Sequence, residues 1–282
     1  MTKTIDQLEK YVSQSRRDIV RMVHAVQSGH PGGSLGCVEY FTVLFHNILK
    51  HDPENFNMEA KNEDVFILSN GHISPVYYST LARSGYFPVE ELATFRKLNS
   101  RLQGHPATHE KLPGIRIASG SLGQGLSVAS GIAQAKRLNG EDRKVFVLCG
   151  DGELQEGQIW EAVMYAAHNK LDNMILTIDV NGRQIDGDTK DIMGFEDLRS
   201  KFESFGWKVM SMEGNNLEDV QDGLSKASVL SGNGQPICIL MTTEMGNGVD
   251  FMMGSHEWHG IPPNDDQLVD ALVQNPETLG DY

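Results

Sequence analysis

The chain has 282 residues, of which 39% are hydrophobic and 22% charged, and these are values of a globular protein with a sizeable core. Its net charge of −14 argues against a nucleic acid or an acidic membrane as partner. Its three cysteines are far apart and have neither disulfide-framework nor zinc spacing. The first ten residues lack the apolar core of a signal peptide, and no apolar run approaches the roughly 18 residues that span a bilayer. We therefore expect a cytoplasmic protein.

The N-terminal pattern predicts two helices separated by a glycine-rich loop. Thr4–Gln7 has the form of a capping box, and apolar residues at helical spacing follow it as far as residue 26. The next loop contains His30, which the following proline holds in an extended backbone. Glycines on both sides leave space around the imidazole, so His30 is a better candidate for a site than a histidine on a helix face. The second helix is expected over 36–50.

Two more histidines follow a glycine in predicted loops. His72 comes just after a strand predicted over 64–69, at the carboxyl end where open α/β sheets bind ligands. His105 lies in a later loop. A single loop histidine is most often structural, but three Gly-His loops so close together are hard to explain by packing alone. Neutral imidazoles can donate to phosphate oxygens or sugar hydroxyls and can move protons near pH 7.

The stretch that follows His72 predicts short helices and one loop of small residues. Helices are expected over 75–81 and over 89–98. The loop 118–125 is rich in Gly and Ser and runs into a helix over 126–138. Its small side chains permit close approach by a flat ligand or by another backbone, or simply tight helix packing.

The tripeptide Gly150–Gly152, with Asn181 further on, predicts a binding site at the edge of a parallel sheet. The surrounding elements are a strand, a helix and a strand, over 144–149, 153–169 and 174–179. A right-handed crossover places the two strand ends side by side, so Asp151 and Asn181 should face one cavity. A carboxylate and an amide carbonyl suit Mg²⁺ or Ca²⁺, with phosphates as further ligands. The alternative is an ordinary turn with a capping Asp.

The remainder of the chain continues the alternation of helices and strands. Beyond a polar loop over 183–190, the elements expected are a helix, a strand, a helix, a strand and a terminal helix, over 195–205, 207–212, 216–230, 236–242 and 264–273. A long glycine-broken loop over 246–260 carries two histidines and fits a mobile lid. We expect one α/β domain over 1–282, with a doubly wound, mostly parallel sheet and helices on both faces.

Seven short motifs stand in an order and spacing that resemble the N-terminal, pyrophosphate-binding part of transketolases. Each motif is weak alone, but together they are highly specific, and the resemblance covers nearly the whole chain. The motifs are Ser28–Gly32, Ser69–His72, Gln103–Pro106, Gly120–Gly125, Gly150–Gly157, Asp179–Gly182 and Trp258–Gly260.

The resemblance implies that thiamine diphosphate is bound together with Mg²⁺ or Ca²⁺. The matching metal ligands are the side chains of Asp151 and Asn181 and the backbone carbonyl of Arg183. The positions that touch the diphosphate are matched by His72, Gly152 and His259, and those beside the cofactor rings by Gly120, Ser121 and Leu122. The residues that contact the sugar and assist its proton transfers are matched by His30, His105 and His259. Glu156 matches a buried acidic contact between paired chains.

The implied reaction is transfer of a two-carbon ketol unit from a ketose to an aldose, with the cofactor's thiazolium accepting electrons. Full-length transketolases are more than twice as long. They add a pyrimidine-binding domain, which holds the glutamate that activates the cofactor, and a C-terminal domain. They also carry Pro where Ser121 stands and usually a hydrophobic residue where Arg183 stands. The chain thus resembles the small subunit of two-chain transketolases, which implies a pyrimidine-binding partner chain, an α2β2 heterotetramer and no activity without that partner.

Two other functions stay open. A related thiamine diphosphate enzyme, such as deoxyxylulose-phosphate synthase or a pyruvate dehydrogenase E1 component, is disfavoured by the complete set of sugar-facing histidines. A non-catalytic module of the same fold should have lost metal ligands or histidines, and none is lost. The sequence does not distinguish pentose phosphates from branched-chain or sulfonated sugars as substrates.

Overall fold

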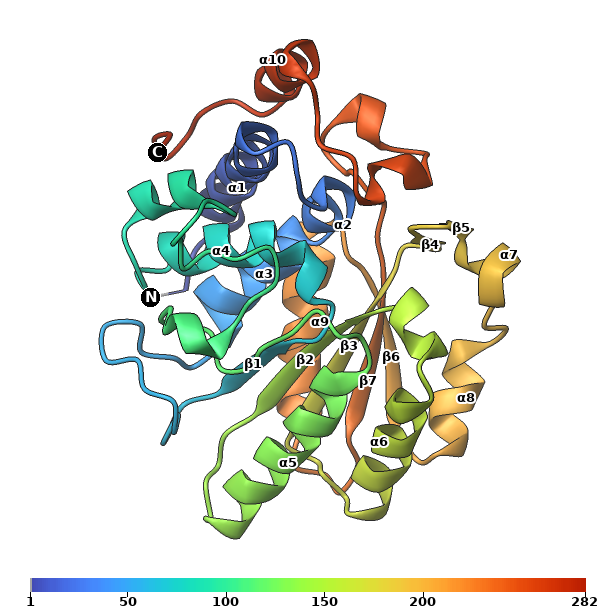
Figure 1. Ribbon diagram of the computed structural model, residues 1–282. Helices are drawn as coiled ribbons and strands as arrows, with labels where there is room; N and C mark the ends of the chain where they lie inside the picture. Colours follow the sequence, from blue (N-terminus) through green and yellow to red (C-terminus); the bar gives the residue numbers. More distant parts are fainter. Residues whose placement is uncertain (1) are drawn as a thin grey trace.

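The computed structural model describes residues 2–282, and its centre is a five-stranded parallel sheet (Figure 1). The strands stand in the order β1-β2-β3-β7-β6, and each neighbouring pair is parallel. Their bounds are Val65–Leu68 (β1), Val145–Gly150 (β2), Met174–Val180 (β3), Lys208–Glu213 (β6) and Ile237–Thr242 (β7). The inner strands are mostly apolar because both faces of the sheet are covered. The predicted mostly parallel α/β sheet is confirmed.

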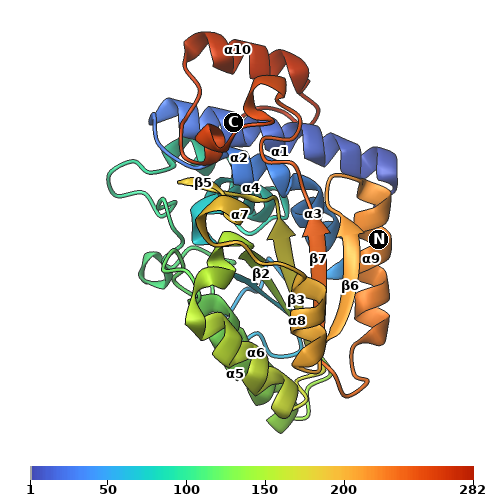
Figure 2. The ribbon, with the colours of Figure 1, turned by 90° about the vertical axis from the view of Figure 1, so that its right-hand side faces the viewer.

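Helices cover both faces of this sheet, as expected for a doubly wound fold. One side carries α1 (Ile5–Ala25), α3 (Val38–Val43), α4 (Ser74–Arg83) and α9 (Leu217–Leu230). The other carries α5 (Gln124–Leu138), α6 (Gly157–His168) and α8 (Leu198–Ser204). Figure 2 shows the sheet between α5 and α6 on one side and α9 on the other. Outside these layers lie α2 (Pro31–Gly36), the hairpin β4 (Arg183–Gln184) and β5 (Gly187–Asp188), α7 (Thr189–Met193) and α10 (Asp265–Gln274).

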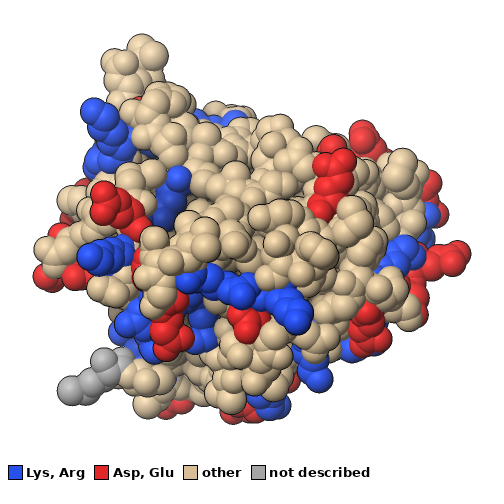
Figure 3. Space-filling model, turned by 90° about the horizontal axis from the view of Figure 1, so that it is seen from below, with Lys and Arg blue, Asp and Glu red and all other residues tan. Residues whose placement is uncertain are grey.

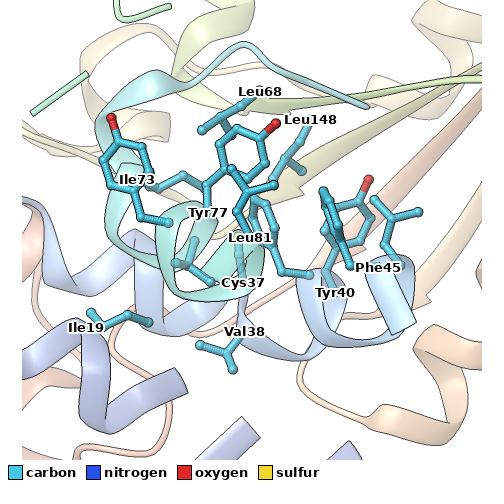
Figure 4. Packing of buried hydrophobic residues seen from close by; sticks show 14 of the residues in the cluster. Ile19, Cys37, Val38, Tyr40, Phe45, Leu68, Ile73, Tyr77, Leu81 and Leu148 are labelled. Carbon is cyan, nitrogen blue, oxygen red and sulfur yellow. The ribbon is translucent and has the colours of Figure 1, made fainter. Parts of the chain in front are cut away.

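Each side of the sheet has its own hydrophobic core. In the larger core, Tyr40 of α3 and Tyr77 of α4 lie against Leu68 and Leu148 of the sheet (Figure 4). The other core joins the opposite sheet face to α5, α6 and α8, where Phe202 is fully buried. Two packed cores hold the strands in one register, and this register fixes the loops at the carboxyl ends of the strands.

The helix predicted over 36–50 is wrong in its start and in its continuity. The helical backbone already begins at Pro31, because a proline fits the first helical position, where its missing N–H is not needed. The chain breaks at Cys37, continues as α3 and ends in a π-helical turn over Leu44–Ile48. Apolar periodicity could not locate these breaks, since the residues on both sides of Cys37 are buried.

Two glycines after His30 pack closely against other segments of the chain. A Cβ on Gly32 would lie 2.6 Å from the Cγ of Met245, and one on Gly33 would lie 2.9 Å from the Cγ2 of Ile73. These glycines are therefore used for close packing, whereas the space beside the imidazole is the cavity that His30 lines. These glycines allow α2 to approach the segment that follows β7, and this approach holds His30 at the N-cap of α2.

Three other elements differ from the prediction. The helix expected over 153–169 is divided into a 3₁₀ turn and α6, because Glu156 has an extended backbone (φ −73°, ψ 123°). The helix expected over 89–98 is a 3₁₀ stretch over Val89–Thr94. The polar loop expected over 183–190 contains the β4–β5 hairpin and the start of α7. Short polar turns of this kind carry no hydrophobic period by which to predict them.

The surface opposite the carboxyl ends of the strands has mixed charge. Seen from below, Lys and Arg side chains are interspersed with Asp and Glu (Figure 3). This face therefore presents no broad patch of one sign within the described residues. None of the helices in residues 2–282 is long and apolar enough to cross a membrane.

Candidate functional site

A cavity of about 300 Å³ lies at the carboxyl ends of β1, β2 and β3. With one exception, every residue that the sequence assigned to a site lines it. These residues are His30, His72, His105, Gly120, Leu122, Asp151, Gly152, Glu156, Asn181, Arg183 and His259. The exception is Ser121, which is exposed and lies outside the lining, so that its contact with the cofactor rings stays a prediction.

A larger and more open groove of about 890 Å³ runs between α1, the start of α9 and the residues after α10. It is lined by none of the glycine-loop histidines and by no residue at the carboxyl ends of β1–β3. Volume alone favours the groove, but the convergence of histidines, carboxylates and strand ends favours the smaller cavity.

Asp151 and Asn181 meet at this cavity as the crossover predicted. The two oxygens of Asp151 accept hydrogen bonds from the backbone N–H groups of Gly152 and Gly182, both at 2.7 Å. The Oδ1 of Asn181 accepts from the N–H of Arg183 at 2.9 Å. Two turns, one after β2 and one after β3, are thus tied to each other through a carboxylate, and this holds the oxygen atoms on the cavity wall.

A second carboxylate, Asp179, stands beside Asp151 and was not singled out from the sequence. It is 2% exposed, accepts from Asn181 Nδ2 at 2.8 Å and also accepts from Thr243 Oγ1. Burial, with the nearby Asp179 charge, raises the pKa of Asp151 to about 7. Among residues 2–282 neither carboxylate has a Lys or Arg within salt-bridge distance. A divalent cation would supply the missing positive charge.

Glu153 is a third buried carboxylate at the cavity, and it lies in the motif Gly150–Gly157 without having been predicted as a site residue. It is 2% exposed and accepts from the N–H of Gly123 at 2.7 Å, the N–H of Gly150 at 3.2 Å and the hydroxyl of Ser69. These donors come from the loops after β1, before α5 and at the end of β2. One side chain therefore connects three loops at the cavity. Burial raises the pKa of Glu153.

Four histidines form the opposite wall. The centroid of the His30 ring lies 5.1 Å from that of His72, 5.5 Å from that of His259 and 6.2 Å from that of His105. The ring centroids of His72 and His259 are 5.0 Å apart. Burial lowers the pKa of all four, to about 4 for His30 and well below the usual range for His72. The four rings are therefore neutral near pH 7, each with one N–H donor and one acceptor nitrogen.

Several buried polar atoms on this side lack a hydrogen-bond partner among the described residues. They are Nδ1 of His30, Nδ1 of His259 and Oδ1 of Asn70, and all three residues line the cavity. Buried polar groups are normally paired, so a cluster of unpaired ones indicates a place where a polar ligand completes the bonding. The residues present therefore fit a ligand that carries phosphate or hydroxyl groups beside a divalent cation.

The glycine-rich loop approaches the histidines closely. Gly120 has φ +121°, and a Cβ there would lie 2.7 Å from the Cδ2 of His105. A Cβ on Gly71 would lie 2.7 Å from the backbone N of Gly120. Larger residues at these positions would therefore displace the loop that borders the cavity.

No three His, Cys, Asp or Glu side chains within residues 2–282 are grouped so as to hold a metal ion by themselves. The predicted metal set has only one carboxylate, so it depends on amide, carbonyl and ligand oxygens, which is usual for Mg²⁺ and Ca²⁺.

The sequence family described as the thiamine diphosphate binding domain of transketolase matches residues 8–275. The chain therefore belongs to the transketolase family, whose members are transferases that move two-carbon ketol units between sugars. Apulose-4-phosphate transketolase subunits A from Actinobacillus succinogenes and Phocaeicola vulgatus are 41% and 34% identical over 95% and 98% of this chain, and each match covers 96% of the relative. A 6-deoxy-6-sulfo-D-fructose transketolase subunit from Clostridium sp. is 36% identical over 87% of this chain.

Full-length transketolases match as well, but only in part. The crystal structure from Campylobacter jejuni superposes with a TM-score of 0.89 and 36% identity over 97% of this chain and 43% of that one. Human transketolase is 33% identical over 90% of this chain and 40% of its own length. Within the family, the chain is the N-terminal subunit of a transketolase divided between two chains, and the expected resemblance is confirmed.

Proposed function

We propose that the cavity holds thiamine diphosphate and a divalent cation, and that the chain forms half of a two-chain transketolase site. One observation carries the proposal. Oxygen ligands at two neighbouring strand ends face a single cavity opposite four neutral histidines, and unpaired polar atoms lie on the histidine wall.

The metal would be held by the carboxylate of Asp151, the amide oxygen of Asn181 and the backbone carbonyl of Arg183. Mg²⁺ and Ca²⁺ prefer such hard oxygen donors, and diphosphate oxygens would complete the coordination. The buried Asp151–Asp179 pair supports the proposal, because an added cation would offset two neighbouring negative charges.

The diphosphate would lie against Gly152, His72 and His259. Gly152 allows its backbone to come close to a phosphate, and neutral histidines can donate an N–H to a phosphate oxygen. The cofactor rings would lie against the loop that contains Gly120, Ser121 and Leu122. Glu156 is exposed at the border of the cavity, which fits the proposed acidic contact with a paired chain.

When bound, the cofactor supplies a carbanion and an electron-accepting thiazolium for the ketol transfer. The chain's own part is to position the sugar and to exchange protons with its hydroxyl groups. His30, His105 and His259 suit this work, since a neutral imidazole both donates and accepts a hydrogen bond and can take up or give a proton. The unpaired Nδ1 atoms of His30 and His259 are available for such bonds.

The partner would be a chain with the pyrimidine-binding and C-terminal domains. We propose that residues 1–282 form one diphosphate-binding domain, that two copies of each chain assemble as an α2β2 heterotetramer, and that the enzyme works in the cytoplasm. The names of two similar subunits contain apulose-4-phosphate and 6-deoxy-6-sulfo-D-fructose, which carry a phosphate and a sulfonate group. These names support a ketose with an anionic end group as donor. Ordinary pentose phosphates share this feature.

Co-expression of the chain with a C-terminal transketolase subunit tests the proposal. The purified complex is given phosphorylated and sulfonated ketoses with aldose acceptors, with and without thiamine diphosphate and Mg²⁺. Ketol transfer should require both chains, the cofactor and the metal. Transfer by this chain alone would contradict the proposal. Decarboxylation of a 2-oxoacid without ketol transfer would indicate a related thiamine diphosphate enzyme, and cofactor binding without any turnover would indicate a non-catalytic module.

A further inference from the structure

Arg183 has a side-chain contact that its proposed metal role does not use. Its Nη1 lies 3.1 Å from Oε1 of Glu244, just after β7, and its side chain is 19% exposed. The same Oε1 accepts a hydrogen bond from the N–H of Gly254 at 2.8 Å. The β4 hairpin, the end of β7 and the segment that leads to His259 are thus joined at one carboxylate.

The Gly254–Glu244 bond is the last hydrogen bond to a distant segment before His259. Among the described residues, the backbone between Gly254 and His259 makes only local bonds, including Glu257 N–H to Ser255 Oγ at 3.2 Å. Its further support is packing, since the rings of Phe251 and Trp258 are 5.3 Å apart. The rings of His30 and His72 also border the His259 ring, at centroid distances of 5.5 and 5.0 Å, and the Gly254 anchor adds the hydrogen bond that ties this segment to the end of β7.

Glu244 itself is fixed from the other side. Its N–H donates to Oδ1 of Asn215 at 2.7 Å, and a Cβ on Gly36 would lie 3.0 Å from its carbonyl oxygen. The backbone of Glu244 is therefore held in place, but its side chain is 45% exposed, and the guanidinium of Arg183 is the cation that pairs with it. A hydrophobic residue at position 183 would not make this pair.

We infer that Arg183 is a positioning residue for His259, acting through Glu244 and Gly254. The guanidinium is neutralised by Glu244, with Asp188 4.0 Å from its Nε, so it serves this contact and not an anionic substrate. The same residue lines the cavity, and its backbone carbonyl is the proposed metal ligand. The catalytic consequence rests on the proposed function, whereas the positioning of the segment does not.

Hydrogen exchange of the full chain without cofactor tests the positioning directly. Arg183→Met keeps the backbone carbonyl and the aliphatic stem but removes the charge. The Gly254 amide should exchange about fivefold faster in this variant, as expected for the loss of a partly exposed charge-assisted contact. The ¹³C-labelled ring resonance of His259 should move or broaden. Lys190→Met is the matched control, because Lys190 is an exposed cation of the same region that pairs with Asp188 at 3.3 Å and does not touch Glu244.

The charge-swapped pair Arg183→Glu with Glu244→Arg separates pairing from general damage. In this pair the cation at position 244 can pair with the carboxylate at position 183, but it cannot accept the Gly254 N–H. Its Gly254 amide should therefore stay as fast as in Arg183→Met, whereas Arg183→Lys should restore most of the protection. Wild-type exchange in Arg183→Met, or equal acceleration in Lys190→Met, would overturn the inference.

The kcat of the complex with the partner chain then measures the consequence for the reaction. In Arg183→Met, kcat should fall several-fold, and Arg183→Lys should recover it. If the wild-type complex shows no ketol transfer, the proposed function fails while the exchange result still decides the inference. If transfer is present and the variant's kcat is unchanged despite fast exchange, the segment's position does not matter for turnover and the role of Arg183 toward His259 is refuted.

Discussion

The carboxylate wall and the histidine wall of the cavity are built in opposite ways. Asp151, Asp179 and Glu153 are each held by backbone N–H groups, hydroxyls or an amide from at least two loops. On the other wall, His30 and His259 keep an unpaired buried nitrogen. The fold completes the carboxylate wall by itself but needs a positive charge there. The histidine wall is shaped by packing and left open for the hydrogen bonds of a ligand.

The largest effect is expected from breaking the carboxylate wall. Asp151→Ala should weaken metal-dependent thiamine diphosphate binding by at least about 100-fold, because removal of a group that only orients a metal ligand already costs 10–100-fold. Titration calorimetry with Mg²⁺ or Ca²⁺ measures this effect, and Asp142→Ala, on an exposed loop, is the control. The fold should persist, as seen by circular dichroism. Unchanged cofactor affinity would remove Asp151 from the metal site.

A change on the histidine wall should act on turnover instead. His30→Ala in the assembled enzyme should lower kcat by about 100-fold or more, in the usual range for loss of a proton-transferring group. Its cofactor affinity should change little. If thiamine diphosphate is lost from this variant, the division between substrate-side and phosphate-side histidines is wrong.

The contributions of His30 and Asp151 to the free energy of unfolding should change with pH in opposite directions. The pKa of His30 is lowered from 6.5 to about 4, so the unfolded chain binds a proton between these values that the folded chain does not, and His30 reduces stability as the pH falls. The raised pKa of Asp151 acts in the opposite direction over most of this range. The two contributions therefore partly cancel in the free energy of unfolding of the wild-type protein.

The variant His30→Asn separates the contribution of His30 from that of Asp151. Between pH 6.5 and pH 4, its free energy of unfolding should rise relative to that of the wild type by about 3 kcal/mol, from 1.36 kcal/mol per pKa unit. Urea unfolding at several pH values measures the difference. His46, whose pKa is also lowered to about 4 by burial, lies outside the cavity and stays in both proteins as an internal reference. A constant difference between the two proteins would show that His30 titrates normally.

The smallest effect is expected from the bracing carboxylate. Glu153→Gln would place an amide NH₂ against the N–H of Gly123 or Gly150, so the three loops would separate slightly. Cofactor affinity should fall about tenfold, as for other groups that act through a ligand-binding neighbour. Glu203→Gln, at an exposed position of α8, serves as control. Equal affinity in both variants would mean that the loops hold their places without Glu153.

The part of this site that could be predicted from the sequence is the part governed by topology. Alternating strands and helices imply a parallel sheet, and a parallel sheet brings Asp151 and Asn181 to one edge whatever the side chains elsewhere. The Gly-His loops were recognisable because a glycine before a histidine is repeated. These signals depend on local residue types and on the hand of the crossover.

What the sequence could not supply depends on contacts between distant segments. Glu153 is bonded to Gly123 thirty positions away, and nothing in its neighbourhood indicates a buried acid. Asp179 is the last polar residue of a buried strand, a place also typical of a simple turn. The close packing of Gly32 could not be predicted, because the segment that it contacts, around Met245, comes more than two hundred residues later.

The most direct test of the central claim is a crystal structure of this chain with its partner, Ca²⁺ and thiamine diphosphate. We predict a single cation bound by Asp151, Asn181 and the Arg183 carbonyl, with diphosphate oxygens on its remaining positions and both unpaired histidine nitrogens engaged. A cofactor bound with its cation elsewhere, or a strand-end cavity that stays empty at saturating cofactor, would contradict the account.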